Sequence, residues 1–283
     1  MSEPVITSDL PIAEHGGEWR QLARALLHIE DADAKARLAQ ALYEGRHQLT
    51  LDADATLAPP QPDTPTMPRG LQLAPHTEVA RRSPATLHGR AVLVHAIVHI
   101  EYNAIHLALD AVWRFAGMPQ AYYEDWLRIA AEEGRHFQML RAQLRAMGYD
   151  YGDFPAHQGL WTMCEKTSGD IVARMALVPR TLEARGLDAT PLIQQKLAHV
   201  DTEDARAISA ILDVILEEEV GHVAIGNHWY RWLCAQRGLD AEALYPQLVA
   251  RYEAPRPKPP LNLAARRQAG FSEAELDYLE WGG

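Results

Sequence analysis

Four glutamates and two histidines have the types and the spacing of metal ligands. Two of the glutamates are each followed three residues later by a histidine, so each pair projects from one helical face about one turn apart. One Glu from each of two helices and a Glu-x-x-His from each of two others bind two metal ions in a four-helix bundle. The sequence therefore predicts a carboxylate-bridged two-metal site. Its six ligands would be Glu101, Glu133, His136, Glu183, Glu219 and His222.

Three of these glutamates share their helical faces with apolar residues. The neighbours include Val98 and Ile105 beside Glu101, Ile129 and Phe137 beside Glu133, and Ile215 and Val223 beside Glu219. Burying unpaired carboxylates is costly, and these faces offer no Lys or Arg. Two divalent cations would neutralise the four acids. The pattern is weakest at Glu183, whose face also holds Pro179 and Arg180.

The turn between the first two ligand helices gives an independent check. Gly117 lies sixteen residues from both Glu101 and Glu133, and Pro119 follows it closely. Glycine ends helices and proline begins them, so the two helices should form a hairpin. In an antiparallel hairpin both glutamates then lie at the same height.

The third ligand helix is less regular. Pro179 removes a backbone hydrogen bond and should kink the helix one turn before Glu183. Residues 186–191 are expected to interrupt it before it resumes at Leu192. The disturbance could open the site to a substrate or could be a plain packing kink, and the sequence leaves both open.

One further Glu-x-x-His needs a different interpretation. Glu44-Gly-Arg-His47 repeats the letters of Glu133-Gly-Arg-His136. It ends a short amphipathic segment before a proline-rich stretch and has no partner glutamate. We interpret it as a solvated helix end.

Composition narrows the class of protein. The chain has 283 residues and a net charge of −11, which argues against nucleic-acid binding through a broad basic face. A tRNA substrate would need a local basic cluster, for example from Arg81, Arg82 and Arg90. Cys164 and Cys234 stand alone, which fits a reducing cytoplasm. The first ten residues lack the pattern of a signal peptide, and no apolar run approaches the ~20 residues of a membrane span.

The pattern of helices predicts an all-α protein. We expect an N-terminal helical segment and proline-rich arm over residues 1–85, a bundle over 86–236 and a C-terminal helical extension over 237–283. One long crossover would join two helical hairpins, which is the ferritin-like topology. Expected helices cover residues 86–116, 119–147, 170–185 and 202–236, with a last one capped by Ser272 and Glu275. His95, His99 and His106 are interpreted as hydrogen-bonded core or interface histidines, without assigned roles.

Long stretches of the chain resemble a known family. They are HAIVHIEYNAIHLALDAVWRFAG, YYEDWLRIAAEEGRHF, YGDFPAHQGLW, RMALVPRTLEARGLDATP and EEEVGHVAIGNHWY. They look like the ferritin-like domain-of-unknown-function family 455 (DUF455), from about residue 30 to residue 271. More distantly, the chain is similar to a bacterial di-iron hydroxylase of a modified tRNA adenosine and to other di-iron oxygenases. The resemblance implies the same six ligands and a metal site, without a substrate.

The leading hypothesis is a cytoplasmic oxidoreductase in which two Fe ions, or Mn or Zn ions, activate O2 or peroxide for an oxygenase or hydroxylase reaction. The substrate, a small molecule or a modified nucleoside, stays open, and so do the metal, the electron donor and the oligomeric state, with a homodimer as one option. An external electron donor is expected. The alternatives are a ferroxidase or peroxide-detoxifying protein and a non-catalytic, metal-stabilised helical binding module.

Overall fold

The computed structural model describes residues 10–11, 17–60, 63–75, 82–157 and 159–281. Helices dominate this part of the chain, and within it the pairing of extended segments is limited to two isolated bridges. The predicted all-α class is confirmed. Residues 1–9, which carry most of the segment tested for a signal peptide, and Arg81 lie outside the described residues.

The chain divides into two compact units, residues 1–158 and 159–283. The boundary falls before the third ligand helix, so each unit contains two of the four predicted ligand helices. The three-part division of the sequence into arm, bundle and extension stays a prediction.

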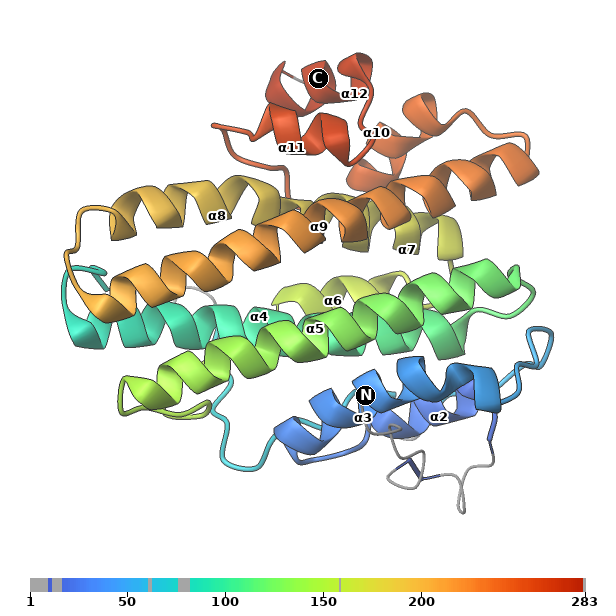
Figure 1. Cartoon of the computed structure of the whole chain (residues 1–283). Helices are drawn as coiled ribbons and strands as arrows, with labels where there is room; N and C mark the ends of the chain where they lie inside the picture. Colours follow the sequence, from blue (N-terminus) through green and yellow to red (C-terminus); the bar gives the residue numbers. More distant parts are fainter. Residues whose placement is uncertain (1–9, 12–16, 61–62, 76–81, 158, 282–283) are drawn as a thin grey trace. The chain divides into compact units, whose positions relative to one another are not determined.

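The first unit is built on a long helical hairpin. Its helices are α2 (Trp19–Leu26), α3 (Ala32–Gly45), the 3₁₀ turn η2 (Arg46–Gln48), α4 (Leu87–Arg114) and α5 (Gln120–Ala146). Helix α4 begins after Thr86, whose hydroxyl accepts a hydrogen bond from the amide of Gly89 at 3.0 Å. Helix α5 packs along α4, while α2 packs on α4 and α3 on α5 (Figure 1).

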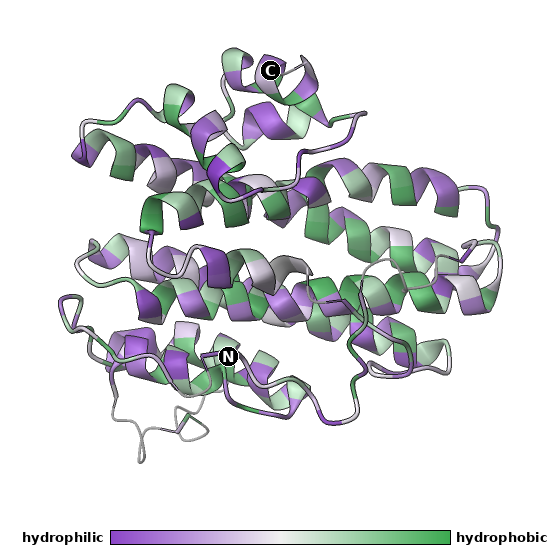
Figure 2. Cartoon of the chain, turned by 180° about the vertical axis from the view of Figure 1, so that it is seen from behind, coloured by the Kyte–Doolittle hydropathy of each residue, from purple (hydrophilic) through white to green (hydrophobic). Residues whose placement is uncertain are grey.

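Helix α4 is the most apolar helix of this unit. Against the expectation from sequence, it is long and apolar enough to cross a membrane by length and composition. However, 78% of the residues in its most apolar window are buried in the protein. This burial is typical of the core helix of a soluble protein. Elsewhere apolar and polar residues interleave along the helices, as amphipathic packing requires (Figure 2).

Residues 51–60, the described start of the proline-rich segment after α3, run as an extended segment without helix, and Arg20 fastens them. The buried guanidinium of Arg20 donates to the carbonyls of Asp52, Ala53 and Ala55 at 2.6–3.2 Å. It also donates to the carbonyl of Trp113 at the end of α4, at 2.9 Å. One cation therefore joins α2, the extended segment and α4.

The second unit carries the other two predicted ligand helices and the C-terminal segment. Its elements are α6 (Gly159–Lys166), α7 (Ile171–Leu177), the π-helix η3 (Val178–Glu183), α8 (Ala184–Leu197), α9 (Glu203–Gln236), α10 (Ala241–Arg251), α11 (Leu263–Gln268) and α12 (Glu273–Trp281). Thr202 caps α9, which begins where the sequence predicts. The capping box before α12 is confirmed, because Ser272 and Glu275 exchange hydrogen bonds between side chain and backbone.

The predicted interruption at residues 186–191 is wrong. Helix α8 runs without a break through Pro191. Proline at this position cannot donate to the carbonyl of Leu187, four residues earlier. The amide side chain of Asn262 donates to that carbonyl instead, at 3.2 Å. A partner 75 residues away in sequence thus satisfies the group that the proline leaves open.

The irregularity falls earlier, at Pro179, where the chain forms the π-helix η3. Helix α9 packs directly on this segment at Gly226. A Cβ on Gly226 would lie 2.5 Å from Cβ of Pro179 and 2.7 Å from its Cγ. Glycine is therefore the residue that allows α9 to approach the proline ring.

We expect Gly226→Ala to lower the free energy of unfolding by about 1–3 kcal/mol, because the methyl group overlaps Pro179. Gly186→Ala is the matched control, since Gly186 lies in α8 with no atom within 4 Å of an added Cβ. Helix propensity should make that variant more stable by up to about 1 kcal/mol. Urea unfolding of both variants measures the difference, and equal effects would contradict the packing argument.

Candidate metal centre

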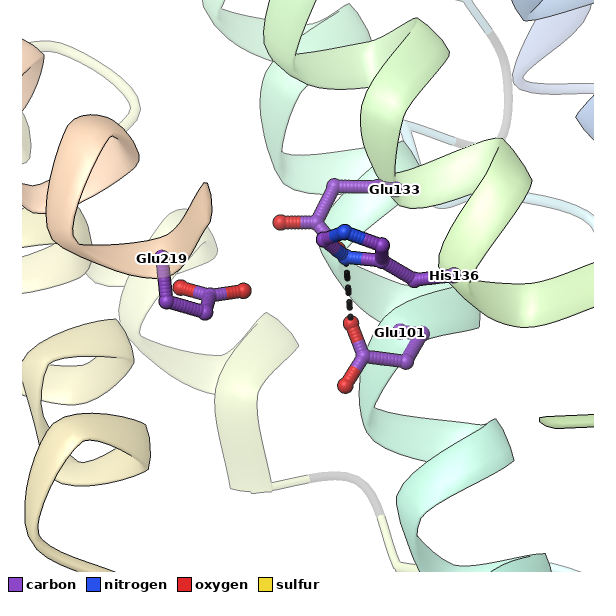
Figure 3. Close-up of side chains that lie close together, drawn as sticks. All are labelled: Glu101, Glu133, His136 and Glu219. Carbon is purple, nitrogen blue, oxygen red and sulfur yellow. Dashed lines mark hydrogen bonds and ion pairs between the residues drawn. The ribbon is translucent and has the colours of Figure 1, made fainter. Parts of the chain in front are cut away.

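Three predicted ligands meet in the first unit. Glu101 on α4 and Glu133 and His136 on α5 point toward one another (Figure 3). One ligand atom of each lies within 4.8 Å of the others, and all three side chains are buried. The predicted register of the hairpin is confirmed, because Glu101 and Glu133 lie at the same level. The short connection, with Gly117 at a φ of 75°, fixes that register.

The distances suit a shared cation. Nδ1 of His136 lies 3.3 Å from a carboxylate oxygen of Glu133 and 3.5 Å from one of Glu101. Two ligand atoms, each about 2.1 Å from one ion and at right angles, would be about 3 Å apart. Small adjustments of the side chains would therefore let one ion contact all three. Carboxylate oxygen and imidazole nitrogen suit iron, manganese and zinc.

The ionised carboxylate of Glu101 is unfavourable in this site. Burial, and after it the neighbouring charge of Glu133, raise the pKa of this carboxyl to about 8, while His136 acts in the opposite direction. In the absence of a cation, Glu101 thus holds a proton at neutral pH. A divalent ion would replace that proton and lower the cost of two adjacent carboxylates.

The second unit holds the remaining predicted ligands. Glu219 and His222 lie one turn apart on α9, both buried, with Nδ1 of His222 at 3.6 Å from a carboxylate oxygen of Glu219. Their spacing repeats that of Glu133 and His136. Glu183 is the last residue of η3 and is partly exposed. This unit therefore holds two carboxylates and one imidazole of the predicted set.

The other Glu-x-x-His is a solvated helix end, as predicted. Glu44 and His47 are both exposed where α3 passes into η2. The same four letters therefore occupy a buried and an exposed position in one chain, which makes this motif a natural control.

Three histidines of α4 are buried and hydrogen-bonded, as interpreted from the sequence. Nε2 of His95 accepts from the amide of Gly152 at 3.0 Å. His99 contacts the hydroxyl of Tyr151 and the carbonyl of His157, at 2.8 and 2.6 Å. Burial lowers the pKa of His95 and of His99 to about 4, so both are neutral at physiological pH. They fasten the loop after α5 to α4.

Sequence reasoning missed Lys35, a fully buried lysine on α3. Its Nζ donates to the carbonyls of Leu27 and Thr66 at 3.0 and 2.9 Å and lies 2.7 Å from Nε2 of His106. It also lies 5.0 Å from the ring centroid of Tyr102, the residue after Glu101. Burial lowers the pKa of Lys35 well below its ordinary value. Its position on the apolar side of α3 was a signal in the sequence, but its partners were not.

The comparison with known proteins gives the family. Residues 28–277 match the family described as protein of unknown function, DUF455. The chain is also 45% identical over 271 residues to an uncharacterized protein of Haemophilus influenzae, covering 92% of this chain and 93% of that one. This chain belongs to the DUF455 family. No solved structure matches this DUF455 protein.

The buried carboxyl of Glu101 predicts how the stability of the metal-free DUF455 protein depends on pH. The folded chain keeps the proton of Glu101 up to about pH 8, whereas the unfolded chain loses it near 4.5. Stability from this group is therefore complete below pH 4.5 and is lost as pH rises through 8. The free energy of unfolding should fall by at most about 1.4 kcal/mol per pH unit from this group.

Glu101→Gln removes the titrating group and should flatten this part of the profile. The measurement is urea unfolding of both proteins in chelator between pH 5 and pH 8.5. Parallel profiles for the two proteins would show that Glu101 ionises normally in the fold.

Proposed function

We propose that the two ligand groups combine around two metal ions, and that the protein is a di-iron or di-manganese oxidoreductase. The observation that carries this proposal is the buried cluster of Glu101, Glu133 and His136. A single cation there leaves the matching group of Glu183, Glu219 and His222 without a function. Two ions use all six residues, with a neutral imidazole for each ion and carboxylates that bridge and terminate the pair.

The chemistry of the ligands favours redox metals. Mixed oxygen and imidazole ligation fits iron or manganese better than copper, while zinc would compete by affinity alone. A bound iron pair would supply the activation of O2 or peroxide. The protein would hold the ions and keep water away from them. The proposed reaction is the hydroxylation or oxygenation of an organic substrate, with electrons from a separate reductase or ferredoxin.

The π-helix supports an enzyme over a purely structural metal site. Such segments often occur at functional sites, because they shift the side chains that follow. Here the π-helix ends on Glu183, a proposed ligand. The side chain of Glu183 is partly exposed, whereas the other three proposed glutamate ligands are buried. An accessible carboxylate is the ligand best placed to make room for O2 or substrate.

The structure offers little support for the basic cluster that a tRNA substrate would need. Arg90 is buried, and its guanidinium donates to the carbonyl of Pro84 at 2.9 Å. Arg90 therefore stabilises the chain at the start of α4 and is not available to bind a phosphate at the surface. A small molecule or a free modified nucleoside is the substrate class that we favour.

Metal stoichiometry tests the ligand set directly. The wild-type protein should bind two Fe²⁺ per chain under anaerobic conditions, and His136→Ala should bind at most one tightly. His47→Ala is the matched control from the same Glu-Gly-Arg-His letters and should bind two. Equal stoichiometry in all three proteins, or none in the wild type, would reject the proposed ligands.

Exposure to O2 tests the redox role. The Fe²⁺-loaded protein should develop an absorption band typical of a bridged ferric pair. Two tightly bound ions that neither oxidise nor consume O2 or peroxide would favour the metal-stabilised scaffold instead. A very large hollow assembly in a sizing experiment would favour iron storage.

A further inference from the structure

Arg180 is a buried cation in the middle of the π-helix η3. Its guanidinium lies 2.7 Å from a carboxylate oxygen of Glu275 on α12 and donates to the side-chain oxygen of Asn227 on α9, at 2.7 Å. The rings of Tyr230, Tyr245 and Phe271 lie 4.6–5.3 Å from it. A charge in such surroundings is stable only while its partners stay in place.

The two partners of Arg180 are themselves fixed. Glu275 accepts a hydrogen bond from the amide of Ser272 and pairs with Arg231 at 2.6 Å. Asn227 donates to the carbonyl of Ala269 at 2.7 Å. The network of Arg180, Asn227 and Glu275 therefore joins η3, α9 and the segment that contains α11 and α12. Figure 1 shows these last two helices beside α9.

The network acts on a segment whose backbone departs from the regular α-helix. Pro179 has no amide hydrogen to donate, and a π-helix packs its turns less regularly than an α-helix. Side chains supply the missing constraint. The hydroxyl of Thr181 donates to the carbonyl of Ala176 at 2.8 Å and contacts Tyr245, while Arg180 fastens the segment to α9 and α12.

The proposed ligands of this unit lie on the elements that the network joins. Glu183 follows Arg180 by three residues, and His222 precedes Asn227 by five on α9. We propose that Arg180 is a positioning residue, which with Glu275 and Asn227 holds η3 against α9 so that Glu183 can ligate the metal bound by Glu219 and His222. This inference rests on the proposed function and gives α12, which carries Glu275, a role in positioning the proposed ligand Glu183.

Metal titration of Glu275→Gln and Arg180→Lys tests the proposal. Glu275→Gln removes the charge of the partner at nearly constant size, and Arg180→Lys keeps the positive charge but loses the planar guanidinium that contacts Glu275 and Asn227 together. With Mn²⁺ as the probe, the dissociation constant of the weaker-bound ion should rise about 10- to 100-fold. That of the ion at Glu101, Glu133 and His136 should stay within about threefold.

Asp188→Asn is the control. It breaks the buried pair of Asp188 and Arg266, at 2.6 Å, which joins α11 to α8 without touching Arg180. It should lower thermal stability to a similar degree and leave both metal affinities within about threefold. Equal metal affinities in all three variants, or an equal loss in all three, would overturn the positioning role.

Amide hydrogen exchange in the metal-free proteins separates this inference from the proposed function. Exchange at residues 181–184 should be at least about tenfold faster in Glu275→Gln than in Asp188→Asn. Unchanged exchange overturns the inference whatever metals bind. If the wild type binds fewer than two ions while exchange rises as expected, the proposed metal function fails and the network is shown to hold η3 alone.

Discussion

The structure depends on the burial of carboxylates between helices. Glu101 and Glu133 lie together among buried side chains, with His136 close to both, and each negative charge disfavours the other. A proton or a cation has to compensate. The long straight hairpin of α4 and α5, its short connection and its apolar packing hold these groups at one level, so that the compensating charge has a defined place.

Short-range patterns in the sequence predicted the ligand spacing, the helix starts and the register of the hairpin. The three-residue spacing of Glu133 and His136 determines that they share a face, whatever the rest of the fold does. Thr86, Thr202 and Ser272 mark helix starts because a capping side chain acts only on the next turn. The level register of Glu101 and Glu133 followed from the short loop between two helices. How the second unit's ligands meet the first three is still a prediction.

The features that sequence reasoning missed depend on distant partners. Helix α8 continues past Pro191 because Asn262 replaces a backbone donor, and nothing near the proline indicates this. Lys35 is stable in the core because carbonyls and His106, 71 residues away, surround it. In the sequence, Arg180 weakened the prediction that Glu183 is a buried ligand, because a cation on a helical face indicates that the face is exposed to solvent. In the fold it is neutralised by Glu275, which lies 95 residues further along.

The pairing of Arg180 with Glu275 also constrains the order in which the protein can mature. A ribosome makes Glu183, Glu219 and His222 before it makes Glu275. Until α12 has emerged and docked, the guanidinium of Arg180 lacks its counter-charge, and the turn around Pro179 lacks its anchor. A nascent or prematurely terminated chain therefore contains all six proposed ligands before Arg180 has the buried partner that fastens η3.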